Sequence, residues 1–349
     1  MHKLFLFLFI IHFSSLPCST FSLKSGSSYF VGKNYDWNVE SGRIFINKRN
    51  VKKVAFKVVN PVSWTSKFGS LTFNQYGQDF PIGGMNEKGM VIEALWLNET
   101  IYPPRNEAQQ NIDNMQWIQY HLDNSADIND VIKNDSLIQV SPTSASAVHC
   151  FVTDKNGKSL IFESVNGVTH HYLTENSNYP FLTNDPYDKS VRMINKCKLF
   201  GGDLEVPEGK GSITRFIHIG IALKDYLLEK SDPIDYSFNI LKIVQLGGYT
   251  KWSIVYDLDN LKVYYRSKSA KRIKVIDMNK IDLKCLDGSK SIDIINRYKG
   301  EITDLLTPTS IDDNKRMVLE AFQNTPFLKN MNPEYIKDIY NYPKQFKCD

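Results

Sequence analysis

The chain has 349 residues, of which 42% are hydrophobic and 12% aromatic, and it carries a formal net charge of +4 at neutral pH. This composition suits one large globular domain or two ordinary ones. The positive charge is spread along the chain, and the basic stretch near residue 270 is typical of a solvated edge. The sequence therefore does not indicate a nucleic-acid-binding protein.

The first element in chain order is a signal peptide, which we predict over residues 1–17. A short basic start precedes residues 4–11, which are apolar throughout. A membrane span needs about 20 apolar residues, so this run is typical of an export signal, and we expect no stable membrane span. The protein is therefore expected to be exported, either periplasmic or secreted. No Pro/Gly/Ser-rich linker, run of like charges or repeat divides the remainder, so residues 18–349 are predicted as a single domain.

Cys18 follows the leader directly, so removal of the leader would make this cysteine the new N-terminus. One residue would then carry both a thiol and a free α-amine, whose pKa of about 7.7–8.0 allows it to act as the base for its own side chain. Pro17 is unusual at the end of a leader, and a second, self-catalysed trimming step is one hypothesis that would free Cys18. The alternatives are a cysteine without a function and the lipidated cysteine of a non-enzymatic envelope lipoprotein, although the preceding residues match a lipoprotein box poorly.

Two short strand-like runs follow Cys18 and are separated by a turn rich in serine and glycine, which predicts a β-hairpin. The central turn residues are predicted as Ser25 and Gly26. With this turn, Cys18 faces Lys33 across the hairpin, and Asp36 follows one short step beyond. A cation and a carboxylate are therefore expected beside the cysteine. A slip of one residue in the register would move Lys33 to the other face.

Further strands and helices are predicted from the periodicity of apolar residues. The strands are expected at 44–47, 54–59, 68–73, 90–97, 148–153, 158–163, 168–173, 252–257 and 261–266. The helices are expected at 113–123, 126–133, 187–200, 212–229, 234–246, 312–323 and 333–340. This order of strands, a helical pair, strands, a helical block, strands and a helical tail indicates an α+β fold with antiparallel hairpins, and it argues against a parallel βαβ arrangement.

Four further cysteines could form disulfides in three pairings, and the sequence does not choose among them: Cys150, Cys197, Cys285 and Cys348. None has CxxC spacing and the seven histidines do not cluster with them, so no metal site is predicted. His149 and Cys150 resemble a catalytic pair at first sight. Neighbours on a strand point to opposite faces, however, so Cys150 is predicted to be a buried strand cysteine.

Five short motifs follow Cys18 in a recognisable order: GKNYDW at 32–37, GMNEKGM at 84–90, LTNDP at 182–186, SITRF at 212–216 and WSIVYDLDNLKVYYR at 252–266. With these motifs, the chain from Cys18 to about residue 280 resembles the choloylglycine hydrolase family, amidases that include penicillin V acylases and bile salt hydrolases. The resemblance implies a four-layer αββα sandwich of the N-terminal-nucleophile (Ntn) hydrolase type. It also implies hydrolysis of a linear amide of a small-molecule substrate through an acyl-enzyme, with no metal or cofactor.

The resemblance further assigns roles to four residues besides the cysteine. Asp36 matches the aspartate that contacts the cysteine's amine, and Arg215 matches an active-site arginine that would favour the thiolate and hold Asp36. Asn184 matches the asparagine whose amide helps to bind the tetrahedral oxyanion, and Trp96 lies where a backbone N–H completes that site. Without the resemblance, these residues would be interpreted as a strand-end carboxylate, a solvated helix arginine, a turn asparagine and a core tryptophan.

Substrate specificity is the least determined property. Trp37 and Trp96 together resemble the Gram-negative, penicillin V acylase-like subgroup and are candidate substrate-binding residues, with ordinary core packing as the alternative. This pattern favours penicillin V, N-acyl amino acids or acyl-homoserine lactones over conjugated bile salts. Lys33 stands where the family usually has arginine, which keeps the charge but loses the planar two-point fork, so an inactive member of the fold is a further alternative. The chain could form a homo-oligomer, and the subunit count stays open.

Overall fold

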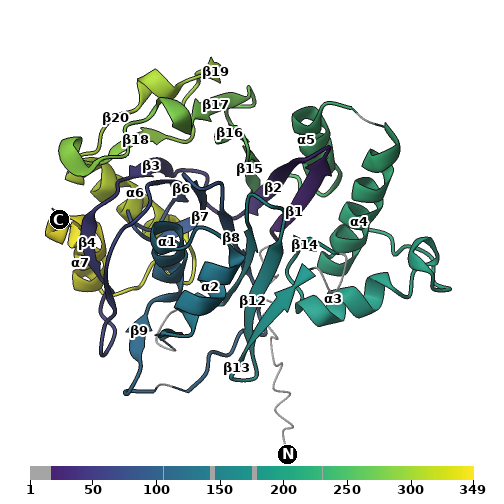
Figure 1. The fold of residues 1–349 in the computed structure, drawn as a ribbon, viewed down its shortest axis with the longest axis horizontal. Helices are drawn as coiled ribbons and strands as arrows, with labels where there is room; N and C mark the ends of the chain where they lie inside the picture. Colours follow the sequence, from purple (N-terminus) through teal and green to yellow (C-terminus); the bar gives the residue numbers. More distant parts are fainter. Residues whose placement is uncertain (1–16, 105, 142–145, 175–178, 230) are drawn as a thin grey trace, which may run out of the picture.

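The computed structural model describes residues 17–104, 106–141, 146–174, 179–229 and 231–349. Two large β-sheets form its centre (Figure 1). The first sheet has seven strands in the order β14 (Phe181–Leu182), β1 (Ser19–Ser25), β2 (Ser28–Asp36), β15 (Thr250–Asp257), β16 (Lys262–Ser267), β17 (Lys274–Asp277) and β19 (Gly300–Glu301). The second has nine, in the order β13 (Val168–Leu173), β12 (Ser159–Val165), β11 (Val148–Thr153), β8 (Val91–Trp96), β7 (Pro81–Asn86), β6 (Ser70–Asn74), β3 (Arg43–Asn47), β18 (Lys290–Asp293) and β20 (Thr307–Pro308).

The strands of both large sheets pair antiparallel, apart from the parallel pair β17 and β19. Smaller ribbons join β21 (Lys347–Cys348), β4 (Val51–Val54) and β5 (Ser63–Thr65), and separately β9 (Gln110–Ile112) and β10 (Ile138–Val140). Short 3-10 helices cover Lys198–Phe200, Met278–Lys280, Cys285–Asp287, Thr303–Leu305 and Tyr342–Gln345. The predicted antiparallel architecture is confirmed.

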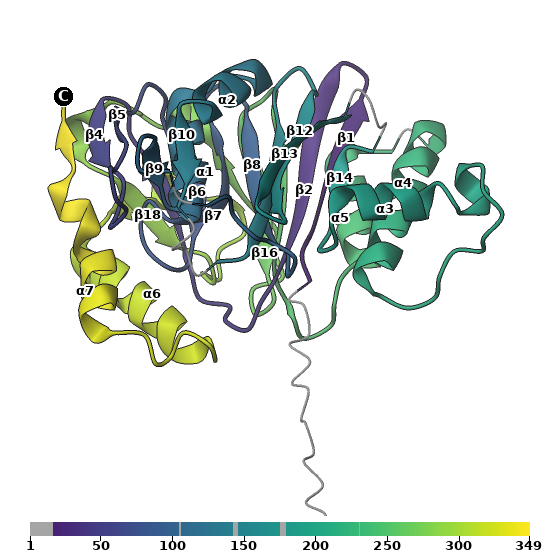
Figure 2. The ribbon, with the colours of Figure 1, turned by 90° about the horizontal axis from the view of Figure 1, so that it is seen from below.

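Helices cover the outer face of each sheet, as the side view in Figure 2 shows. The first sheet carries α3 (Tyr187–Ile194), α4 (Ser212–Glu229) and α5 (Pro233–Ile243). The second sheet carries α1 (Asn114–Asn124), α2 (Ile128–Asp135), α6 (Ile311–Asn324) and α7 (Pro333–Asn341). The layers are therefore helix, sheet, sheet and helix, and the predicted αββα sandwich is confirmed.

Apolar side chains fill three connected interiors in this sandwich. The largest lies between the two sheets and continues under α4 and α5. A second lies between α1, α2 and the outer face of the nine-stranded sheet. The third lies beneath α6 and α7, where Phe56, Phe80, Phe322 and Ile339 pack together. All seven predicted helices are present, although α3 ends at Ile194, earlier than expected.

The prediction of a strand at residues 54–59 is wrong. The chain leaves the ribbon at Val54 and turns, with positive φ angles at Lys57 and Asn60. Phe56 then packs against aromatic rings from the C-terminal helices, which explains why this apolar segment is not used as a strand.

Strand β7 was not predicted from the sequence, because its proline and two consecutive glycines are typical of a turn. These glycines are needed for packing. A Cβ atom on Gly83 would lie within 2.2 Å of the Glu93 carboxylate, and one on Gly84 would lie within 2.4 Å of the carbonyl oxygen of Leu71. The glycines therefore let neighbouring strands approach closely at the centre of the second sheet.

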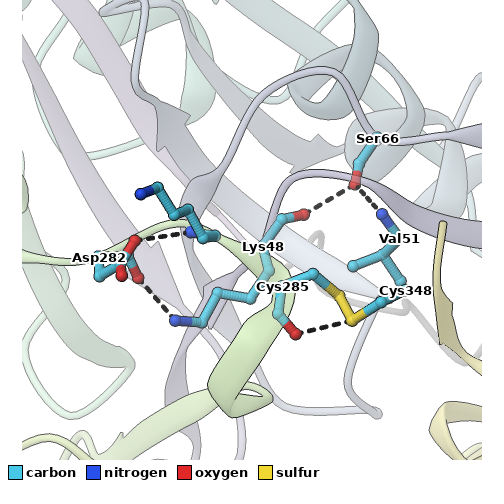
Figure 3. The surroundings of a disulfide bond; sticks show 7 residues. Lys48, Val51, Ser66, Asp282, Cys285 and Cys348 are labelled. Atoms are coloured by element: carbon cyan, nitrogen blue, oxygen red, sulfur yellow. Dashed lines mark hydrogen bonds between the residues drawn. A yellow bond between two sulfur atoms is a disulfide. The ribbon is translucent and has the colours of Figure 1, made fainter.

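One disulfide bond joins Cys285 and Cys348, with their Cα atoms 5.7 Å apart (Figure 3). It fixes the C-terminal strand β21 beside Val51 of β4. Cys150 and Cys197 are buried and unpaired, so the four cysteines do not form two bonds. The prediction that Cys150 is a buried strand cysteine is confirmed.

Candidate active site

The hairpin of β1 and β2 places Cys18 at the start of the first sheet. Ser25 pairs with Ser28, and Thr20 pairs with Lys33, so the predicted register is wrong by two residues. The turn centres one residue later than predicted, because Gly26 is the residue that adopts the positive φ of 62°. A shift of two residues preserves the face of every side chain, so Lys33 still lies on the face of Cys18.

The Cys18 side chain is 3% exposed and lines a pocket between the sheets and the C-terminal helices. Its thiol donates to the backbone carbonyl oxygen of Asp36 at 3.8 Å. Burial raises the pKa of this thiol, while the charges of Lys33 and Arg215 lower it and that of Asp36 raises it further. Two cations therefore favour the thiolate in surroundings that otherwise disfavour any charge.

Arg215 connects the parts of the site. It lies on the first turn of α4 and is fully buried, which excludes the alternative of a solvated helix arginine. Its Nη1 donates to the carbonyl oxygen of Cys18 and to the hydroxyl of Ser19, and its Nη2 donates to Oδ1 of Asn184 at 2.9 Å. Burial lowers the pKa of the guanidinium, and the nearby charge of Asp36 raises it. This one side chain fixes the cysteine backbone and the asparagine amide relative to each other.

Asn184 follows β14 and is held at three points. Its backbone N–H donates to the Ser212 hydroxyl at 2.8 Å, its Oδ1 accepts from Arg215, and its Nδ2 donates to the carbonyl oxygen of Trp96 at 2.7 Å. These contacts fix which side of the amide is oxygen and which is nitrogen. The amide nitrogen therefore faces the end of β8, where Trp96 lies.

The backbone of Trp96 points away from the neighbouring strand β11. Leu97 donates its N–H to Ala147, and Trp96 is paired with Val148. In an antiparallel ladder this makes Trp96 a non-hydrogen-bonded position, so its N–H and C=O both point to the opposite side. The strand on that opposite side of β8 is β7, and the last residue pair between them is Gly83 with Glu93. The pairing with β7 therefore ends before it reaches Trp96.

Asp36 ends β2 and is completely buried, which excludes an exposed strand-end carboxylate. Neither of its carboxylate oxygens accepts a hydrogen bond of normal geometry among the residues that the structure describes, although the Thr250 side chain lies near enough to lower the pKa of Asp36. Burial raises the pKa of Asp36 to about 7, whereas Thr250, Arg215 and Lys33 act in the opposite direction. A buried carboxylate without a partner is energetically unfavourable. A cation beside Cys18 would therefore stabilise the ionised form of Asp36.

Lys33 is also fully buried, and its ammonium donates to the carbonyl oxygen of Ala94 at 2.5 Å. It lies 3.5 Å from the carboxylate of Glu93, which in turn accepts from the hydroxyl of Tyr256 at 2.5 Å. Burial raises the pKa of Glu93 to about 7, against the lowering effect of Lys33 and Tyr256. Glu93 was not predicted as a site residue, although a carboxylate within the apolar strand Val91–Trp96 is a visible signal in the sequence.

A second buried pair supports the segment that carries Asn184. Nε2 of His149 lies 2.7 Å from the carbonyl oxygen of Thr183, and its Nδ1 lies 3.2 Å from Glu163. Glu163 also accepts from the backbone N–H of Tyr187 at 3.1 Å. The side chain of Cys150 lies instead in the outer core, so the prediction that it and His149 point to opposite faces is confirmed.

Trp37 and Trp96 both line the pocket that leads to Cys18, and their ring centroids lie 5.8 Å apart. Nε1 of Trp37 donates to the hydroxyl of Tyr76, and Nε1 of Trp96 donates to Asn98 at 2.7 Å. The pocket wall is otherwise mainly apolar and aromatic. The site therefore combines a polar cluster at Cys18 with an apolar chamber, the arrangement common in small-molecule sites.

Within the described ranges, no group of histidine, cysteine, aspartate and glutamate side chains is arranged to hold a metal ion. No helix among these residues is long and apolar enough to cross a membrane.

Two stacked antiparallel sheets between helical layers, with a cysteine at the start of an inner strand, define an Ntn-hydrolase sandwich. Residues 18–199, which are about half of the chain, match the linear amide C-N hydrolases of the choloylglycine hydrolase family. The chain belongs to this family, and it is therefore an amidohydrolase of linear amides.

Comparison with individual proteins agrees with this assignment. The chain is 24% identical over 300 residues to a penicillin V acylase from Pectobacterium atrosepticum, covering 74% of this chain and 79% of that protein. The structure is similar to a penicillin V acylase from Agrobacterium tumefaciens, with a TM-score of 0.74, 23% identity, and coverage of 84% of this chain and 98% of the other. It is also similar to a variant of a conjugated bile acid hydrolase from Clostridium perfringens, with a TM-score of 0.68, 22% identity, and coverage of 81% and 98%.

Proposed function

We propose that the protein is an exported cysteine amidase that cleaves a linear amide with an apolar acyl group, and that Cys18, freed at the N-terminus, is its nucleophile. One observation carries this proposal. A single buried arginine, Arg215, joins the backbone of Cys18 to the side chain of Asn184, beside a carboxyl group of Asp36 that accepts no hydrogen bond of normal geometry among the described residues. A free α-amine on Cys18 would supply the missing cation.

The reaction begins when the α-amine of Cys18 takes the thiol proton, directly or through a water. The thiolate attacks the amide carbon, and the amide of Asn184 and the N–H of Trp96 bind the developing oxyanion, since both face the same space beside β8. The protonated amine then gives its proton to the leaving nitrogen, which releases the amine product. Water hydrolyses the thioester, with the α-amine again as base.

Two buried charges orient this N-terminus. The carboxylate of Asp36 pairs with the ammonium form of the amine, and Arg215 holds the cysteine backbone in position through its carbonyl oxygen. Lys33 acts on the thiol through its charge only, because its ammonium donates to Ala94 and pairs with Glu93. A lysine suffices for this purpose, since no two-point contact is required of it.

The substrate is an amide with an aryl-acyl or alkyl-acyl group. Trp37 and Trp96 contact this acyl group when the substrate is bound. The apolar lining of the pocket supports this class, as does the similarity to penicillin V acylases. Penicillin V, N-acyl amino acids and acyl-homoserine lactones are the first substrates to test. The similarity to a conjugated bile acid hydrolase makes glycine-conjugated bile salts the second candidate class.

The test combines the N-terminal sequence and intact mass of the secreted protein with turnover on these four classes of amide. We expect an unmodified Cys18 at the N-terminus, turnover of an aryl-acyl or alkyl-acyl amide, and no turnover by the Cys18→Ala variant. The matched control is Cys150→Ala, which removes a free, buried thiol outside the site and should keep activity. A lipidated Cys18, or a secreted chain that keeps Pro17, would refute the mechanism, and a preference for bile salts would overturn the substrate class.

A further inference from the structure

We propose that the C-terminal arm, defined as residues 309–349, is the specificity-determining wall of the acyl pocket, and that Phe327 is the residue through which it selects flat, apolar acyl groups. This inference rests on the proposed amidase function and names what the site selects. The arm lies outside residues 18–199, which match the family. That match therefore assigns no role to the arm.

One continuous segment of the arm, residues 322–339, contributes six side chains to the lining of the pocket. The residues that it contributes are Phe322, Phe327, Leu328, Met331, Tyr335 and Ile339. They extend from the solvent to the interior, because Phe327 is 39% exposed whereas Phe322 and Ile339 are 5% exposed. The arm thus supplies six apolar or aromatic side chains to the pocket wall, and the rest of the wall comes from the two sheets, α1 and their connections.

Phe327 completes an aromatic cluster at the mouth of the pocket. Its ring centroid lies 6.2 Å from that of Trp37, edge to face, and 5.7 Å from that of Trp96. The two tryptophan rings are themselves 5.8 Å apart, so the three rings are in mutual contact. All three residues line the pocket, so the cluster presents aromatic surface to it, against which a planar acyl group can pack.

A buried chain of polar contacts fixes the position of Phe327. Trp37 donates from Nε1 to the hydroxyl of Tyr76, and that hydroxyl lies 2.7 Å from the hydroxyl of Thr325. Thr325 is completely buried and also donates to the carbonyl oxygen of Ala321 at the end of α6. The loop that carries Phe327 is therefore tied, two residues earlier, to the same tryptophan that Phe327 contacts.

The arm is also held at its far end, so it is a fixed wall and not a free tail. Asn314 of α6 accepts from the backbone N–H of Gln78 at 2.9 Å and donates to the carbonyl oxygen of Tyr340 in α7 at 2.8 Å. After α7 the chain pairs with β4 and is bonded covalently through Cys348 (Figure 3). Rigid support of this kind is what a selective site requires.

The first test measures selectivity in Phe327→Ala, with Tyr340→Ala as the matched control. Tyr340 is an aromatic residue of the same arm that does not line the pocket. We expect Phe327→Ala to raise KM for a phenoxyacetyl amide about tenfold and to leave kcat within about twofold, because it removes a contact made equally before and during reaction. The ratio of kcat/KM between the phenoxyacetyl amide and a glycine-conjugated bile salt should fall by the same factor. Equal ratios in the wild type, Phe327→Ala and Tyr340→Ala would refute the proposal.

A second measurement needs no turnover and separates this inference from the proposed function. The rates at which iodoacetamide and N-benzyl iodoacetamide alkylate Cys18 are compared by peptide mass, and their ratio cancels the intrinsic reactivity of the thiol. We expect the ratio of benzyl to small reagent to fall about fivefold or more in Phe327→Ala, to fall less in Phe327→Leu, and to stay unchanged in Tyr340→Ala. An unchanged ratio in Phe327→Ala, or a Cys18 that neither reagent reaches in either protein, would overturn the inference even where the amidase activity is found.

Discussion

The buried carboxyl group of Asp36 gives the sharpest test of the proposed N-terminus. Burial raises its pKa from 3.8 to about 7. A pKa that is higher by 7 − 3.8, or about 3, corresponds to about 4 kcal/mol, at 1.36 kcal/mol for each tenfold change in the ionisation constant. This free energy is the cost of ionising Asp36 in surroundings where burial outweighs the lowering effects of Thr250, Arg215 and Lys33.

The pH dependence follows from the direction of the shift. The folded-state pKa of Asp36 lies above the unfolded one, so the folded chain holds a proton that the unfolded chain releases between about pH 4 and pH 7. The destabilising effect of Asp36 is therefore absent below about pH 4 and complete above about pH 7. Asp36→Asn removes the ionisable group and keeps the shape of the side chain.

We expect Asp36→Asn to increase the free energy of unfolding at pH 8 in a chain that begins at Pro17, by up to about 4 kcal/mol. The gain should disappear towards pH 4. In a chain that begins at Cys18, the new ammonium pairs with the Asp36 carboxylate and lowers its pKa, so the same substitution should give a much smaller gain or a loss. Urea denaturation of the two chain lengths, each with and without the substitution, measures all four values.

The control is Asp203→Asn, which changes an exposed carboxylate and should alter stability by less than about 0.5 kcal/mol in either chain. An equal effect of Asp36→Asn in both chains would show that the α-amine does not pair with this carboxylate. A loss of stability at pH 8 in the chain that begins at Pro17 would show that Asp36 has a partner there and that the reasoning from burial is wrong.

Three further predictions concern the other parts of the site. Asn184→Ala should lower kcat about 10²–10³-fold with a smaller change in KM, as for an oxyanion donor, and an effect on KM alone would contradict that role. Arg215→Lys should lower kcat and reduce stability by about 2 kcal/mol or more, because a lysine cannot reach the backbone of Cys18 and the Asn184 side chain together; urea titration measures the loss. Cys348→Ser should destabilise the protein by about 4 kcal/mol, since the bond closes a loop of 63 residues, and reduction of the wild type should reproduce the effect.

Most of the polar site could be predicted because five short motifs resemble those of the choloylglycine hydrolase family in content and order, and each matched residue takes its role from that resemblance. Asp36 ends a strand, Asn184 follows one, and Arg215 lies on the first turn of a helix, and the structure brings all three to Cys18. Lys33 was predicted on the correct face, but not opposite the correct residue, since it pairs with Thr20 and not with Cys18. The reason is geometric, since side chains alternate with a period of two and an error of two residues leaves them on the same face.

The parts that could not be predicted depend on contacts between distant segments. Glu93 interacts with Lys33 across 60 residues of sequence, and no local pattern fixes that pair. The strand that contains Gly83 and Gly84 was missed because its residues favour a turn until the neighbouring Glu93 and Leu71 are considered. The helices of the arm were predicted, but their contact with the pocket was not. The periodicity of an amphipathic helix indicates which of its faces is buried, but not which residues pack against that face.

The proposed removal of the leader changes the electrostatic balance of the site as well as its chemistry. Before cleavage, the nitrogen of Cys18 belongs to a neutral amide, and the ionised form of Asp36 is costly in its buried position. After cleavage, the same nitrogen is an ammonium ion beside that carboxylate, and the cost is offset by their attraction. On this view, cleavage stabilises the arrangement that catalysis requires, because the amine that takes the thiol proton becomes the ammonium ion that pairs with Asp36. The effect of Asp36→Asn on the free energy of unfolding is measured in both chain lengths. The difference between the two effects then gives the free energy by which removal of the leader stabilises the ionised Asp36 in the active site.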